Sequence, residues 1–448
     1  MLFKRNIIHL LEKWAAKPDR KPLILRGARQ VGKTTVVDMF AKGFDTYITL
    51  NLEIPGDLAI FREEFDVHQL YRAILVTKKI NPQGRVLLFI DEIQNSPAAL
   101  KNLRYFYEQK KDLYVIAAGS LLEALFKSRP AGFPAGRVEF LYLYPATFRE
   151  FLQARQETQA LAYYDTVPLD PVARAPLLKL FHEYALVGGM PEAVRKYAAG
   201  DEVTALNPVY ESLVNSYLGD TEKYAGSGKQ RQVLRHCLEA IPGETGQRIK
   251  FHGFGRSGYG SREAGEALRI IEKAMLIYLV YPTTGYALPA RPDRRKYPLL
   301  QFIDTGLLNY TAGLQASHFS HPDLCSLHQG IVAEHIVRQE LIAGDLERRT
   351  APLFWVRDKK QAQAQLDAVI PYQDRLVPLE VKAGKTGRLR SLHAFIDRAP
   401  CRLAVRLYAG ELAIAETQTP EGKPYRLVNL PYFLAGKIHE YLDHYAIA

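Results

Sequence analysis

Residues 27–34 read GARQVGKT, and the spacing of the two glycines, the lysine and the threonine is typical of a phosphate-binding loop. A short apolar run, PLIL at residues 22–25, precedes the loop, and apolar residues at helical spacing follow it. We therefore predict a strand, the loop and a helix, in which backbone N–H groups turn inward around phosphate oxygens at the positive end of the helix dipole. This stretch predicts an α/β nucleotide-binding fold.

The loop residues have distinct expected roles. Lys33 should reach the β- and γ-phosphates of ATP, and the Thr34 hydroxyl should bind Mg²⁺. The residues expected to surround the nucleotide are Gly27, Ala28, Arg29, Gln30, Val31, Gly32, Lys33, Thr34 and Thr35. ATP and Mg²⁺ are thus the predicted ligands.

A second motif, RVLLFIDEIQ at residues 85–94, supplies the acids that such a loop needs. Its apolar run is typical of a buried parallel strand that ends at the phosphate edge of a sheet. Asp91 would hold Mg²⁺ through water, and Glu92 would orient or deprotonate the attacking water. A buried strand that ends in acids for no catalytic reason is the alternative, and the accompanying loop argues against it. Further strands are predicted at residues 46–50, 113–118 and 138–143.

Two other polar residues adjoin predicted strands. Ser120 follows the strand at residues 113–118, where it could sense the γ-phosphate or cap the next helix. Arg137 precedes the strand at residues 138–143, where it could be an arginine finger supplied to a neighbouring subunit. An ordinary surface arginine is the alternative at that position.

The composition of the 448-residue chain limits its class and partners. Its length allows two to four domains, and 47% hydrophobic residues give each a core. Three widely spaced cysteines fit a reduced cytoplasmic protein, and no apolar run is long enough for a membrane span. The net charge is +11, and residues 221–310 carry 14 Lys and Arg against 8 Asp and Glu. This excess suggests a polyanionic partner, with a merely solubilising surface as the alternative.

The basic region has the pattern of two helices and a basic turn. Helices are predicted at residues 231–241 and 261–279, the second beginning at an N-cap, Ser261. With a wing at residues 282–297, this order resembles a winged-helix domain whose recognition helix starts near Ser261. DNA contact is expected through Arg262, Arg269, Arg294 and Arg295, and docking of a protein is the alternative.

The stretch PLEVKAGKTG at residues 378–387 also contains GKT, but a second phosphate loop would need glycine where Leu379 stands. Its strand pattern instead places Glu380 and Lys382 on one face. If the preceding QLDAVI strand joins it through a two-residue turn at residues 373–374, Asp367 directly opposes Glu380. Two opposed carboxylates repel each other unless a cation such as Mg²⁺ or Mn²⁺ lies between them.

A helix predicted at residues 330–342 brings a third acid, Glu334, onto a partly apolar face. A charge there is costly without a partner. An ion pair with Arg338, one turn later, would satisfy it. Membership of the metal site is the other explanation.

The motifs GARQVGKTT, LLFIDEIQ, AAGS, AGRV, LYPATFREFL and VGGMPEAV resemble a widespread prokaryotic family of AAA+ ATPases with a restriction-endonuclease-like carboxy-terminal domain. The resemblance implies that Pro191, in the G-G-x-P segment of the lid, lies close to the adenine. The order Glu334, Asp367, Glu380, Lys382 resembles the PD-(D/E)xK nuclease superfamily, which uses these positions for metal binding and phosphodiester hydrolysis. FIDTGLLNY at residues 302–310 also matches the family, but its residues suggest no chemistry.

These observations give an α/β protein of four parts. We expect an AAA+ P-loop core at residues 1–155, a helical lid at 156–225, a winged-helix domain at 226–312 and a PD-(D/E)xK nuclease-like domain at 313–448. The predicted function is ATP hydrolysis coupled to engagement of nucleic acid, DNA more than RNA, with a homo-oligomer as one possible assembly. The alternative is an ATP-driven switch or scaffold whose nuclease-like domain binds a partner without cutting it.

Overall fold

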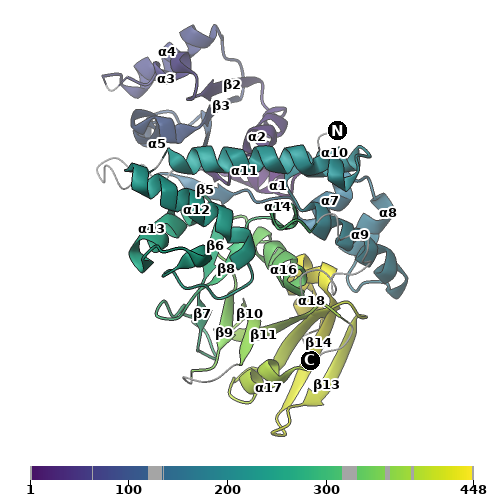
Figure 1. The fold of residues 1–448 in the computed structure, drawn as a ribbon. Helices are drawn as coiled ribbons and strands as arrows, with labels where there is room; N and C mark the ends of the chain where they lie inside the picture. Colours follow the sequence, from purple (N-terminus) through teal and green to yellow (C-terminus); the bar gives the residue numbers. More distant parts are fainter. Residues whose placement is uncertain are drawn as a thin grey trace.

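The structure is a computed structural model that describes residues 3–62, 64–119, 134, 136–223, 225–314, 330–358, 364–384 and 388–445. Ser120, predicted to sense the γ-phosphate, lies outside these ranges, as do two residues of the second GKT, Lys385 and Thr386. Figure 1 shows one sheet near the amino terminus, a second sheet in the carboxy-terminal part, and helices between them.

A five-stranded sheet forms the core of the first third of the chain. Its order is β2-β3-β4-β1-β5, and all four neighbouring pairs are parallel. The strands are β1 (Leu23–Arg26), β2 (Thr46–Asn51), β3 (Val86–Asp91), β4 (Tyr114–Gly119) and β5 (Glu139–Tyr142). The strands predicted from the sequence are confirmed, and the ends of the four whose bounds were predicted differ by one residue at most.

Helices cover both faces of this sheet because successive strand side chains point to opposite faces. Leu23 and Leu25 pack with one apolar cluster, whereas Ile24 belongs to the other. The first cluster includes α1 (Ile8–Ala16) and α2 (Lys33–Ala41), and the second includes α4 (Val67–Lys78) and α5 (Pro97–Gln109). The short helix α3 (Pro55–Leu58) follows β2.

A group of helices follows the sheet and lies between it and the rest of the chain (Figure 1). These are α7 (Phe148–Ala154), α8 (Thr158–Asp165), α9 (Arg174–Val187), α10 (Pro191–Ala198) and α11 (Asn207–Glu222). Helix α7 begins with a capping box in which Thr147 and Glu150 satisfy each other's backbone N–H groups.

The basic region forms two helices and a small antiparallel sheet. Its elements are α12 (Gly228–Glu244), α13 (Ser261–Lys273), β6 (Ile277–Val280) and β8 (Leu299–Phe302). The helix predicted at residues 231–241 is confirmed within α12. The helix predicted over residues 261–279 begins at Ser261 as expected, although Gly260 and not Ser261 occupies the cap position. Its predicted end is wrong, because the helix stops at Lys273 and the buried run IYLV forms a strand. A β-branched and aromatic run of this kind favours a strand once it is paired.

The carboxy-terminal sheet has seven strands in the order β13-β14-β12-β11-β10-β9-β7. They are β7 (Pro282–Thr283), β9 (Leu353–Val356), β10 (Gln365–Tyr372), β11 (Arg375–Lys382), β12 (Leu403–Tyr408), β13 (Ala413–Gln418) and β14 (Pro424–Pro431). The helices that follow in this part of the chain are α16 (Ile331–Ala343), α17 (Arg390–Ile396) and α18 (Ile438–Tyr445). Helix α14 (Thr305–Thr311) instead packs against α9, α11 and α16. Strand β7 comes from the segment expected to form the wing, and it pairs in parallel with β9.

The hairpin of β10 and β11 has the predicted register. Ala368 pairs with Leu379, and Tyr372 pairs with Arg375 across the two-residue turn at residues 373–374. In this register Asp367 and Glu380 are the next opposed positions. The turn length was sufficient to predict the register. Once the two turn residues are fixed, each residue of one strand has a single opposed residue on the other strand.

Asp304 joins three parts of the chain, and it explains the FIDTGLLNY segment. Its carboxylate is fully buried, caps α14 by accepting the Leu307 N–H at 3.1 Å, and accepts the Gly189 N–H at 2.6 Å. The amide of Gln339, on α16, donates to it at 3.4 Å. Burial raises the pKa of Asp304 to about 6. The segment therefore connects the turn at Gly189 with α16.

Glu340 makes a second buried connection between α16 and the ATPase part. Its Oε1 accepts the Phe148 N–H at 2.9 Å and the Tyr184 hydroxyl at 2.7 Å. Its Oε2 is buried and receives no hydrogen bond from the part of the chain that the structure describes. Burial, which outweighs these hydrogen bonds, raises the pKa of Glu340 to about 7.

Glu340→Gln should remove part of the pH dependence of stability. The pKa of Glu340 rises from an ordinary 4.5 to about 7 on folding, so the folded state holds the proton more tightly. The resulting stability is present below pH 4.5 and is lost as the pH rises through about 7. We expect the melting temperature of Glu340→Gln to fall less than that of wild type between pH 5.5 and pH 8. Parallel pH curves for the two proteins would contradict this.

Gly189→Ala should destabilise the connection between α9 and α10. A Cβ at this position would lie 2.2 Å from the Ala146 carbonyl oxygen and 2.7 Å from the Ala146 nitrogen. Both are backbone atoms, so the clash cannot be relieved by a rotamer change, and we expect a loss of about 1–3 kcal/mol in the free energy of unfolding. Gly228→Ala is the matched control, because a Cβ there meets nothing within 4 Å. Urea denaturation should show a lower midpoint for Gly189→Ala alone.

Candidate active sites

The phosphate-binding loop connects β1 to α2 and depends on glycine at two positions for different reasons. A Cβ on Gly27 would lie 2.5 Å from the Leu143 carbonyl oxygen, so this position allows no side chain. Gly32 has φ 92°, in the left-handed region that favours glycine. Within the described ranges, no side chain caps the first turn of α2. Its N–H groups are therefore oriented for an anion.

Lys33 lies inside the loop, as its predicted role requires. Its Nζ donates to the carbonyl oxygens of Gly27 at 3.0 Å and Ala28 at 2.9 Å. The side chain is buried, and burial lowers the pKa of its ammonium group. A phosphate in the loop would replace these neutral acceptors with charged oxygens, which are stronger partners.

The predicted metal-binding residues of the first site are brought together at the end of β3. The Thr34 hydroxyl donates to Asp91 Oδ2 at 2.7 Å. Glu92 follows with φ 53°, its backbone N–H donating to Asp91 Oδ1 at 3.0 Å, and its carboxylate accepts a hydrogen bond from Gln94. A hydroxyl and a carboxylate oxygen at this separation fit Mg²⁺, which prefers such oxygen ligands.

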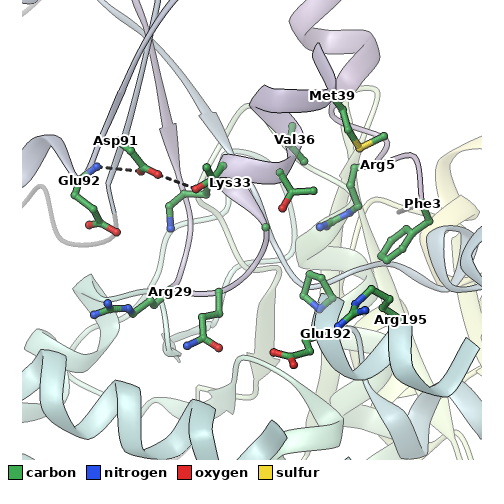
Figure 2. A pocket seen from close by; sticks show the side chains of 15 residues that line it. Phe3, Arg5, Arg29, Lys33, Val36, Met39, Asp91, Glu92, Glu192 and Arg195 are labelled. Atoms are coloured by element: carbon green, nitrogen blue, oxygen red, sulfur yellow. Dashed lines mark hydrogen bonds between the residues drawn. The ribbon is translucent and has the colours of Figure 1, made fainter. Parts of the chain in front are cut away.

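A cavity of about 530 Å³ opens beside the loop (Figure 2). Its volume is in the range of small-molecule sites. The predicted residues that line it are Arg29, Gln30, Gly32, Lys33, Thr34, Thr35, Asp91, Glu92 and Pro191. The side chains of Ala28 and Val31 are instead buried in the apolar core, so these two residues offer only their backbone.

The structure adds Arg5, which the sequence did not single out. Its guanidinium donates to the Val31 carbonyl at 3.0 Å and to the Tyr144 carbonyl at 2.7 Å. It also forms an ion pair with Glu150 at 3.0 Å and lines the cavity. These partners are distant in sequence, and the only signal was a charge in an amphipathic segment. Arg5 therefore links the phosphate-binding loop to the segment after β5 and to α7.

The other predicted residues of this site have different outcomes. Pro191 begins α10 and lies beside the loop, its Cγ 3.6 Å from where a Cβ on Gly32 would be. Arg137 pairs with Glu108 at 3.2 Å and does not line the cavity of its own chain. A role for Arg137 in a neighbouring subunit stays a prediction.

A second constellation forms where α16 meets the hairpin. Burial and the nearby Asp367 carboxylate raise the pKa values of Glu334 and Glu380 to about 7. Asp367 Oδ2 accepts the Val381 N–H at 2.7 Å, and Lys382 Nζ donates to Glu380 Oε1 at 2.5 Å. Glu380 Oε2 is buried and has no hydrogen-bond partner among the described residues. The structure thus places the four predicted side chains near one another.

Arg338 does not provide the simple explanation for Glu334. Its guanidinium donates to the Asp367 backbone carbonyl at 2.9 Å and to the Gln301 side chain at 3.3 Å. No ion pair joins it to Glu334 among the described residues. Equally, within the described ranges no three His, Cys, Asp or Glu side chains are grouped closely enough to hold a metal ion. The ligand roles of Glu334, Asp367 and Glu380 therefore stay predictions.

Sequence comparisons match three consecutive parts of the chain. Residues 19–152 match the family described as AAA domain. This part of the chain is an ATP-binding AAA+ ATPase module. Residues 178–318 and 329–427 match two families described only as domains of unknown function, DUF8612 and DUF4143. Comparison with curated proteins finds no match.

Several solved structures are distantly similar. The Walker-type ATPase of Pyrococcus abyssi is 15% identical, with a TM-score of 0.46 over 69% of this chain and 96% of that chain. The ORC1 protein of Aeropyrum pernix, solved in complex with DNA, is 14% identical, with a TM-score of 0.26 over 70% and 93%. Such distant likenesses carry no argument about partners. Among the described helices, none is both long and apolar enough to cross a membrane.

Proposed function

We propose that ATP hydrolysis in the AAA domain is coupled to metal-dependent action of a nuclease-like domain on nucleic acid, DNA more than RNA. The observation that carries the second half is the opposition of Asp367 and Glu380 on neighbouring strands, with Lys382 beside them. The unpartnered buried oxygen of Glu380 supports a cation there, since a buried carboxylate oxygen is costly without a partner.

The side chains of the acidic cluster have complementary roles in this proposal. Asp367 and Glu380 would hold Mg²⁺ or Mn²⁺, which when bound supplies a Lewis acid for the phosphodiester. Lys382 would orient a water molecule or balance charge on the phosphate, because it projects from the same face as Glu380. Glu334 would steady this arrangement from α16.

The basic region is the proposed contact for the phosphate backbone. Arg262 and Arg295 are highly exposed and paired with acids at 3.2 and 3.0 Å. Arg269 and Arg294 lie over aromatic rings at 5.6 and 5.5 Å. Exposed ion pairs contribute little stability, so phosphates can compete for these arginines. The two helices and antiparallel strands support a winged-helix role for this unit.

Helix α16 supports coupling between the two sites. Glu334 and Arg338, on one side of it, interact with Asp367. Gln339 and Glu340, the next two residues after Arg338, bind Asp304 and the start of α7. A movement of the ATPase part would thus also displace α16, the helix that carries Glu334.

The test is a cleavage assay on purified protein with Mg²⁺ or Mn²⁺, with and without ATP, against single- and double-stranded DNA and RNA. We expect metal-dependent cleavage of DNA that responds to ATP. Binding without cleavage across the whole panel would favour the second candidate, an ATP-driven switch that holds nucleic acid or a protein. The observation that favours this candidate is that no three metal-binding side chains are grouped within the described residues.

A further inference from the structure

Arg29 lies at the phosphate end of the ATP cavity. It belongs to the loop between β1 and α2 and lines the same cavity as Lys33, Asp91 and Glu92. Figure 2 shows Arg29 on the side where these three residues lie, away from Phe3 and Arg195. About one third of its side chain is exposed, so its guanidinium is available to a bound ligand.

Contacts from α11 hold Arg29 in this place. Asp220 accepts a hydrogen bond from Nη1, and the Tyr217 hydroxyl donates to the Arg29 backbone carbonyl at 3.2 Å. Glu53 Oε1 forms a longer ion pair with Nη2 at 3.6 Å, too far for a hydrogen bond. No described residue makes a hydrogen bond to Nε or Nη2. The guanidinium is thus anchored at one nitrogen and keeps donors for another partner.

The other arginines of the region are committed elsewhere. Arg5 is bound to two backbone carbonyls and Glu150. Arg195 lies at the opposite end of the cavity in Figure 2. Arg137 is paired with Glu108 and does not line the cavity. Among the described cavity-lining residues, Arg29 is the arginine beside Lys33 and Glu92.

Phosphoryl transfer requires positive charge at the γ-phosphoryl oxygens as the transition state forms. We propose that Arg29 supplies this charge from the same chain, as a catalytic arginine, and that Asp220 is a positioning residue that aims it. This inference rests on the ATPase half of the proposed function. It makes α11 sensitive to the state of the nucleotide, because Asp220 belongs to that helix.

The hydrolytic step assigns each group a task. Water attacks the γ-phosphorus and gives its proton to Glu92. The bond from the γ-phosphorus to the bridging oxygen breaks, and its electron pair stays on that oxygen of ADP. Arg29 donates hydrogen bonds to the γ-phosphoryl oxygens throughout, and the products are ADP and inorganic phosphate.

Arg29→Ala should lower kcat for ATP hydrolysis by about 1,000-fold or more, while the Kd for ATP changes less than about fivefold. Arg29→Lys should recover only part of the rate, because an ammonium lacks the planar fork. Asp220→Asn should lower kcat with an unchanged Kd. Arg104→Ala is the control, because Arg104 is an exposed arginine on α5 that is paired with Glu108. This variant should hydrolyse ATP at the wild-type rate.

A binding measurement separates catalysis from folding. In wild type, ADP with aluminium fluoride should raise the melting temperature more than ADP alone, whereas Arg29→Ala should lose this additional rise and keep the response to ADP. An intact rate and an intact aluminium fluoride response in Arg29→Ala would overturn the inference. So would a kcat that increases with protein concentration and is lost in Arg137→Ala, because the arginine would then come from a neighbour. If Lys33→Ala still hydrolysed ATP, the proposed ATPase site itself would be wrong.

Discussion

Lys33→Ala should bind ATP about 100-fold more weakly than wild type and show no measurable hydrolysis. Lys33 is the buried cation at the centre of the loop, and removing one member of a buried charge pair costs about 3 kcal/mol. Its loss leaves the phosphates with the backbone N–H groups and the helix dipole alone. Isothermal titration with ATP and a phosphate-release assay measure both quantities.

Two controls make this result specific to the loop. Lys101→Ala removes an exposed lysine from α5 and should behave as wild type. Thr34→Ala should retain more ATP binding than Lys33→Ala but lose the response to Mg²⁺, because Thr34 and Asp91 form the metal end of the site. Unimpaired hydrolysis by Lys33→Ala, in a protein with a normal melting temperature, would show that the loop is not the catalytic site.

Asp367→Ala and Lys382→Ala should separate metal binding from cleavage in the carboxy-terminal domain. We expect Asp367→Ala to lose the heat of Mn²⁺ binding, because one of two opposed carboxylates is gone. Lys382→Ala should still bind Mn²⁺ and cleave DNA about 100-fold more slowly or worse, the size of a lost proton-transfer or electrostatic contribution.

Asp374→Ala is the matched control for this pair. Asp374 lies at the turn of the same hairpin and its side chain is 87% exposed, so its removal should change neither Mn²⁺ binding nor cleavage. Equal Mn²⁺ heats for wild type and Asp367→Ala would count against the metal site and favour the switch.

Local patterns were sufficient to predict the first sheet and the hairpin. The phosphate-binding loop and the strand before Asp91 can be recognised from residues that are close together in the sequence. A two-residue turn fixes the register of Asp367 against Glu380. The end of α13 was missed because the following buried run IYLV, which forms β6, has apolar residues at every position and fits either a helix or a strand.

Contacts between distant segments could not be predicted from one sequence. Arg5 reaches Tyr144, and Asp304 reaches Gly189, across more than a hundred residues. The sequence around Arg5 or Asp304 does not indicate which distant residue each one contacts. The ion pair with Arg338 was one of two explanations for Glu334, and the described residues do not show it. The guanidinium instead donates to the Asp367 carbonyl on another element, which the local sequence could not indicate.

Strand β7 limits how the basic unit can move. It is part of the segment between β6 and β8, yet it is hydrogen-bonded into the carboxy-terminal sheet beside β9. Rotation of the basic unit would therefore have to break sheet hydrogen bonds or carry the whole sheet with it. In the proposed function, a duplex bound by Arg262 and Arg269 would therefore reach Glu380 at a fixed distance from those arginines. That distance would set the position along the nucleic acid at which the protein acts.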